Sequence, residues 1–208
     1  LRNQPLYDKS GLHFGFHIGI NSYNFSMDLK DLSEVNNIFG VESEALPGYN
    51  INIISNLRLT EHLDLRFTPG FAATVRKIHF DLIDPIRDER RIVTRQIESS
   101  YVQFPVHLKF KSVRVDNYRI YLMGGLRYCN DLASRAKVVD DNLFKLQRHT
   151  GDYEFGFGAD FYFEYFKFSP QIRASWGLTN LLVQDGTLPV EAFDAIRNRA
   201  ILVNFTFE

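Results

Sequence analysis

The sequence predicts an all-β fold: an eight-stranded antiparallel up-and-down transmembrane β-barrel with short periplasmic turns and long extracellular loops. Three observations predict it. Apolar residues alternate with polar or small residues along eight segments, which is the period of a β-strand. Short and long connections alternate between these segments, as they do in bacterial outer-membrane barrels. The 208 residues include 19 Phe and 10 Tyr, yet the mean hydropathy is −0.20, so the apolar residues are interleaved with polar ones.

The predicted strands are defined by their apolar faces. In the first strand Leu12, Phe14 and Phe16 share one face, and His13 and His17 share the other. No charged residue interrupts the apolar face of any segment. In chain order the segments cover residues 11–20, 49–59, 63–75, 102–110, 118–128, 153–163, 166–178 and 201–207.

The connections complete the predicted topology. Three are short (60–62, 112–117 and 164–165), and four are long (28–47, 77–96, 130–150 and 179–198). An even number of strands places both termini in the periplasm, so we expect residues 1–10 to form a periplasmic segment and residues 11–208 the barrel domain. We also expect the chain to start after a cleaved leader. Pro69, Pro105 and Pro170 lie inside predicted strands, where a missing N–H usually marks an edge or a bulge. A closed barrel has no edge, so we expect bulges there.

The apolar faces are expected to contact lipid. A soluble lipocalin-type barrel also alternates, but its apolar face points inward. The interior of an eight-stranded barrel holds few side chains, and the apolar positions here are too many and too bulky to fit. The opposite face carries small residues such as Gly15, Gly19, Gly156 and Gly158, which suit a narrow lumen.

Charged residues on the other face of the strands predict a lumen network. Burying charges is costly unless they are paired. Counting from the short turns places Asp160 near Arg66, Arg58 or Lys109, and Glu154 near Arg127 or Arg173. An ion-pair network that plugs the lumen is the favoured interpretation, and a proton or ion path is the alternative. The predicted members are Arg58, Arg66, Lys109, Arg127, Glu154, Asp160 and Arg173.

Several function classes receive no support. The 24 Lys and Arg against 25 Asp and Glu argue against nucleic acid as a partner. His13 and His17 share a strand face but lie roughly 13 Å apart, too far for one metal, so we predict neither a metal nor a cofactor. Cys129 is interpreted as a packing residue. The segment from His149 to Asp152 is the only local candidate for an enzyme, and no catalytic residue is assigned.

The long connections carry apolar residues near helical spacing. Between residues 28 and 47, acidic residues outnumber the single lysine, and Gly40 is a plausible helix C-cap. A second short helix is expected from Pro189 to Arg197. These apolar faces either pack on each other or form a partner surface. The candidate partner residues are Leu29, Leu32, Val35, Ile38 and Phe39.

Four blocks of sequence resemble PorT-family outer-membrane barrels of Bacteroidetes. They are the stretch from Tyr7 to Phe16 with Gly19-Ile20-Asn21, the stretch from Ile97 to Ser112, the stretch from Arg119 to Gly125, and Asn130-Asp131-Leu132-Ala133-Ser134. The resemblance implies a component needed for type IX secretion, which exports proteins bearing a C-terminal signal domain. It brings no enzymatic motif. The alternation up to Phe207 is similar to a terminal strand signal for barrel assembly, although Glu208 departs from the usual aromatic end.

We therefore hypothesise a non-enzymatic accessory or assembly subunit of the type IX apparatus. It would contact the outer-membrane bilayer and other type IX components, including the large translocon barrel, and no nucleic acid. Two alternatives remain: a lipid A-modifying enzyme, and a structural or adhesion barrel of the OmpA-like or OmpX-like type.

Overall fold

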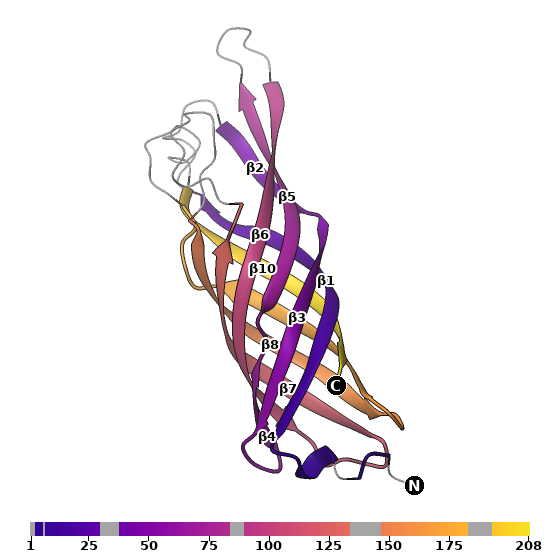
Figure 1. The fold of residues 1–208 in the computed structure, drawn as a ribbon. Coiled ribbons are helices and arrows are strands. Elements are labelled where there is room, and N and C mark those ends of the chain that lie inside the picture. Colours follow the sequence, from indigo (N-terminus) through magenta and orange to yellow (C-terminus); the bar gives the residue numbers. More distant parts are fainter. Residues whose placement is uncertain (1–2, 6, 30–37, 84–89, 134–146, 183–192) are drawn as a thin grey trace.

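The computed structural model shows one antiparallel sheet that closes on itself (Figure 1). It describes residues 3–5, 7–29, 38–83, 90–133, 147–182 and 193–208. A 3₁₀ turn, η1 (Tyr7–Lys9), precedes the strands. The strands of this part of the chain are β1 (Leu12–Leu29), β2 (Ile38–Ala45), β3 (Pro47–Arg58), β4 (Leu63–Phe67), β5 (Gly70–Ile83), β6 (Arg90–Lys111), β7 (Tyr118–Asp131), β8 (His149–Tyr162), β9 (Lys167–Gly177) and β10 (Phe193–Phe207).

These strands make an eight-stranded ring because two of the eight barrel strands are each interrupted once along their length. Leu46 separates β2 from β3, and Thr68 and Pro69 separate β4 from β5, so each pair forms one line of the barrel. β1 closes the ring because Phe16 pairs with Phe207 of β10 on one side and with Ile53 of β3 on the other. The prediction of an eight-stranded antiparallel up-and-down barrel is confirmed.

The prolines interrupt pairing without adding a residue, so the predicted bulges are wrong. Between the pairs Phe67–Val106 and Gly70–Gln103, two residues on each strand are left out of the register. The same happens around Pro170, between β8 and β9. Proline cannot donate to the ladder, and equal numbers of unpaired residues on both strands preserve the register.

The apolar faces point outward over a band of the barrel. Phe14, Ile53 and Ile120 are 66%, 67% and 64% exposed. Aromatic side chains border this band at both ends, as in membrane barrels. Tyr153 stacks on Trp176 with ring centroids 5.4 Å apart at one border, and Phe163 stacks on Phe166 at 5.0 Å at the other.

The two ends of the barrel differ in the connections that they carry. The connections between β3 and β4, β6 and β7, and β8 and β9 lie at one end, together with both termini; we call it the short-turn end (Figure 1). At the opposite, long-loop end, β5 and β6 project beyond the other strands (Figure 1). β6 has 22 residues, whereas about 9–11 suffice to cross a bilayer.

The strands thus continue into the predicted loops. There the inward face becomes apolar and the outward face becomes polar. Along β1, Ile18 and Ile20 are exposed, but farther on Tyr23 and Phe25 are buried and Ser26 is exposed. Beyond lipid, a sheet must bury its apolar face inside the barrel. The predicted helices are wrong where they are described, because Ile38–Gly40 belong to β2 and Phe193–Arg197 to β10. No helix in the described segments is long and apolar enough to cross a membrane.

Candidate functional site

Among the described residues, several groups of paired charges lie in the lumen, and the first centres on Glu154 of β8. Its carboxylate lies 2.9 Å from Arg127 of β7 and 3.1 Å from Arg173 of β9. Nε2 of His107 lies 2.6 Å from the same carboxylate, and Arg127 also pairs with Asp152 at 2.6 Å. All five side chains are at most 1% exposed. Two guanidinium groups thus face two buried carboxylates, and His107 adds a hydrogen-bonding contact to Glu154.

The second group centres on Asp160, six residues farther along β8 toward the short-turn end. Lys109 donates to both carboxylate oxygens, at 2.8 and 2.9 Å. Nε of Arg119 donates at 2.9 Å, and the hydroxyl of Ser169 at 2.7 Å. The Lys109 ammonium also lies 3.6 Å from the ring centroid of Tyr121, a cation–π contact. Every charge in this group has a partner inside the barrel.

The third group gathers around Glu208, which follows the last strand. Its carboxylate lies 2.6 Å from Arg66 and 2.6 Å from Lys167, and Tyr7 donates to it at 2.7 Å. The Glu208 side chain is fully buried. The backbone N–H of Lys167 donates to the Glu208 carbonyl, so this residue continues the pairing of β10 with β9. The polar end of the terminal strand is therefore an inward-facing ion pair.

The structure brings six of the seven predicted network residues into these groups, and the seventh lies elsewhere. Arg58 ends β3 at the short-turn end, where it donates to the backbone carbonyls of Asp8 and Thr60. Sequence reasoning missed Glu208 and Lys167, although a signal was present. Lys167 lies between two outward phenylalanines, and the alternation continued past Phe207 turns Glu208 inward.

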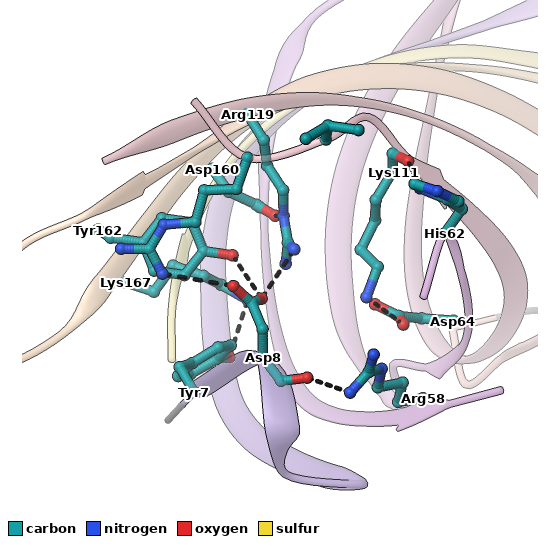
Figure 2. Close-up of polar contacts among 12 residues, drawn as sticks. Tyr7, Asp8, Arg58, His62, Asp64, Lys111, Arg119, Asp160, Tyr162 and Lys167 are labelled. Carbon is teal, nitrogen blue, oxygen red and sulfur yellow. Dashed lines mark hydrogen bonds and ion pairs between the residues drawn. The ribbon is translucent and has the colours of Figure 1, made fainter. Parts of the chain in front are cut away.

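Asp8 closes the short-turn end (Figure 2). Its carboxylate lies 2.8 Å from Arg119 and 3.4 Å from Arg114, and the Tyr162 hydroxyl donates to it at 3.3 Å. Partial burial raises the pKa of Asp8, but Arg119 and Arg114 lower it more, so the net pKa is below its usual value. Tyr7 beside it stacks on the His13 ring, with centroids 4.0 Å apart. The N-terminal segment is thus bound into the mouth of the barrel by side chains from several strands.

Apolar side chains form two clusters in the lumen at the long-loop end. Arg76 lies between these clusters. Its guanidinium is 4.0 Å from the Phe25 ring centroid and donates to Tyr101 and Ser99. Cys129 is buried in the second cluster. The first cluster consists of Phe25, Ile78, Phe80, Leu181, Leu182 and Ile196, and the second of Tyr23, Ala72, Tyr101, Cys129, Ala200 and Leu202.

The arrangement offers little for catalysis. His149 faces outward, where its Nδ1 lies 2.7 Å from the Tyr128 hydroxyl, whereas Asp152 is buried against Arg127. The two residues lie on opposite faces of β8, so they cannot act on one substrate atom. His17 and His107 are both buried in the lumen. Over the described ranges, no group of three potential metal ligands comes together.

A closed ring of strands with an apolar outer wall and a charged, filled lumen defines a membrane barrel, and the comparisons agree. Residues 3–183 match the family described as outer membrane protein beta-barrel domain. The chain belongs to this family. It is therefore an outer-membrane β-barrel protein whose outer wall contacts the lipid bilayer. No curated protein sequence matches the chain.

Among solved structures, the chain is similar to the outer membrane protein OprG of Pseudomonas aeruginosa, with a TM-score of 0.51 and 12% identity over 95% of this chain and 93% of that one. It is also similar to Neisserial surface protein A, at 0.47 and 10% over 95% and 98%. The attachment invasion locus protein Ail of Yersinia pestis, crystallised with a heparin analogue, gives 0.45 and 11% over 95% and 98%. At these identities the OprG similarity shows the fold alone.

Proposed function

We propose that the protein is a non-enzymatic accessory or assembly subunit of the type IX protein secretion apparatus. The observation that carries this proposal is the resemblance to the PorT family. Its blocks fall on the N-terminal turn and the start of β1, on the second half of β6, on β7, and on the end of β7 with the residues after it. The set includes Tyr7 and Asp8, which bind the N-terminal segment to the barrel mouth.

The filled lumen supports a role at the surface of the barrel. Paired charges occupy it from Glu154 to Glu208, and apolar clusters fill the long-loop end. A protein of this kind acts through its outer wall and its two ends. We propose that the short-turn end with both termini faces the periplasm and that the projecting β5–β6 hairpin faces the outside.

The first long connection remains our candidate partner surface. The large translocon barrel remains a proposed partner of the protein. Leu29 is the last residue of β1, and Ile38 and Phe39 are the first two residues of β2. Leu32 and Val35 lie outside the described residues. The strand bounds allow a clean test: residues 30–37 are replaced by a Gly/Ser linker while β1 and β2 keep their sequences. We expect normal folding, read from heat-dependent gel mobility, and reduced surface display of a type IX cargo.

Two experiments test the assignment itself. In the source strain, deletion of the gene should abolish surface display of proteins with the C-terminal secretion signal, and the wild-type gene should restore it. An affinity-tagged protein purified from native outer membranes should co-purify with the large translocon barrel. Normal display in the deletion strain would refute the type IX role and leave the family assignment intact.

A structural or adhesion barrel is the second candidate, and the projecting hairpin favours it. The pairing of β5 with β6 continues to Ile83 and Arg90, and Arg90 also pairs with Asp81 at 2.5 Å. Arg91 and Arg95 nearby are exposed. This reading predicts that hairpin variants lose binding to host or matrix surfaces while type IX cargo display stays normal.

A further inference from the structure

The outer wall has a hollow of about 690 Å³ beside β7, β8 and β9. Large apolar side chains that point away from the lumen form its rim. Four of them are 40% to 64% exposed in the isolated protein: Phe161, Phe157, Leu122 and Ile120. Ser112 is the residue at its margin nearest the short turn between β6 and β7. The hollow is therefore a depression in the surface that contacts lipid.

Small residues at an interruption of the ladder create this depression. Ala159 of β8 lies across from Pro170 of β9, between the pairs Gly158–Gln171 and Phe161–Phe168. The two residues are not paired with each other, although Ala159 pairs with Ile120 of β7 and Pro170 with Phe205 of β10. Pro170 has no N–H to donate, and neither side chain is long enough to fill the wall. On the inner side, a Cβ at Gly158 would lie 2.5 Å from the Tyr121 hydroxyl, so Tyr121 occupies the space behind the floor.

The lining is chemically suited to a hydrocarbon chain. Its polar candidates are engaged: the Tyr121 hydroxyl donates to Gln171 at 3.0 Å, and the Ser112 hydroxyl accepts from the Ile120 N–H at 3.2 Å. Ligand sites typically measure roughly 300–1,000 Å³ and bury most of the ligand's surface. The hollow falls in this range, but it opens onto the bilayer-facing wall and not onto water.

We propose that the hollow is a binding site for one acyl chain of a phospholipid in the leaflet that meets the short-turn end. The depth follows from the register, since only the pair Tyr162–Lys167 lies between the rim residue Phe161 and the turn between β8 and β9. Burial of apolar area gives no preference over bulk lipid, because lipid tails are equally apolar. Retention comes from closer packing, since a chain inside the hollow gains dispersion contacts on several sides. The convex wall of a second barrel cannot enter it.

The test compares two lipid-facing alanines. Ala159→Phe fills the hollow, whereas Ala174→Phe adds the same bulk on β9, outside the hollow lining. Each variant is purified in mild detergent, checked for folding by heat-dependent gel mobility, and washed stepwise before native mass spectrometry. We expect the wild type and Ala174→Phe to retain one phospholipid and Ala159→Phe to retain several-fold less. Equal retention by all three proteins would overturn the proposal.

A second measurement covers the case in which Ala159→Phe does not fold. Ala159→Leu is reconstituted with a spin-labelled phospholipid, and the motionally restricted component of the spectrum is compared with that of the wild type. We expect this component to fall, and an unchanged component would contradict the acyl-chain site. Retention of lipid A in place of phospholipid would contradict the assigned leaflet. That assignment rests on the proposed periplasmic orientation, and the cargo-display experiment tests the proposed function separately.

Discussion

At the scale of single residues, burial determines how much each charge contributes. Glu154 is fully buried and lies between two guanidinium groups and His107. The Arg90–Asp81 pair lies on the projecting hairpin, with the arginine side chain 68% exposed. Removing one partner of a buried pair leaves an uncompensated charge in a medium that solvates it poorly, whereas exposed pairs are screened by water and salt.

Glu154→Gln should destabilise the barrel by about 3–5 kcal/mol, because Arg127 and Arg173 lose their shared carboxylate. The measurement is urea-induced unfolding in lipid vesicles. Asp81→Asn serves as the matched control and should change the free energy of unfolding far less. Equal effects of the two substitutions would show that the lumen pairs are solvated and not buried.

Asp8 makes the binding of the N-terminal segment dependent on pH. Its pKa in the folded protein lies below its ordinary value, since Arg119 and Arg114 outweigh the effect of burial. The stabilising contact is thus complete above the ordinary pKa of about 3.9 and is lost as the pH falls through the lowered pKa. The protection factors of the amides from Tyr7 to Ser10, which correct for the slower intrinsic exchange in acid, should fall on acidification of the wild type. In the Asp8→Asn variant, these amides should already exchange faster than in the wild type at neutral pH. Wild-type protection in this variant would show that Asp8 does not hold the N-terminal segment in the barrel mouth.

At the scale of elements, each long strand has two environments. Within the membrane band of β8, Phe157 points outward and is 58% exposed. On the projecting part of β6, the outward residues Thr94, Gln96 and Glu98 are polar, and Ile92 near its tip is the apolar exception at 68% exposed. The apolar side chains Val93 and Ile97 pack against the inner cluster. The solvent outside the strand determines which face is apolar.

Arginine substitutions should map this boundary. Phe157→Arg should cost about 2–4 kcal/mol because it places a charge near the bilayer midplane. Gln96→Arg should change stability by no more than about 0.5 kcal/mol, since this position faces water. Unfolding in vesicles of constant composition measures both. A water-accessible spin label at position 157 would contradict the assigned membrane band.

At the scale of the whole molecule, side chains of the described residues occupy the lumen along the barrel. Charge groups around Glu154, Asp160 and Glu208 occupy the membrane band, Asp8 closes the short-turn end, and the apolar clusters close the other. Eight-stranded barrels leave interior space only for side chains or one small ligand. The described side chains therefore predict a plugged barrel.

The purified protein in planar bilayers should therefore show no large steady conductance. The barrel's folded state is verified in the same sample by heat-dependent gel mobility, and a porin of known conductance serves as the positive control. Steady openings of porin size would refute the plugged lumen and favour the ion-path interpretation.

The sequence by itself determined the strand pattern and the direction of most side chains. Period-2 alternation is a local property of extended backbone, so it placed Glu154 and Asp160 inside and Phe157 outside without any tertiary information. The alternation of short and long connections likewise predicted the topology. Alternation assigns a face, and counting from the short turns estimated depth well enough to place Glu154 near Arg127 or Arg173 and Asp160 near Lys109. Neither step gives the full set of partners of a residue.

Only the tertiary structure decided which of the candidate partners pair and which residues were missed. Register and strand tilt brought Arg66 to Glu208 and left Arg58 at the mouth, although both arginines face the same way along neighbouring strands. They also extended β1 to Leu29 and started β2 at Ile38, where apolar spacing alone suggested a helix. The physical reason is that beyond the bilayer the outer solvent becomes water. The apolar face must then turn into the barrel, and the place where this happens is set by how the strands pair and not by any one of them.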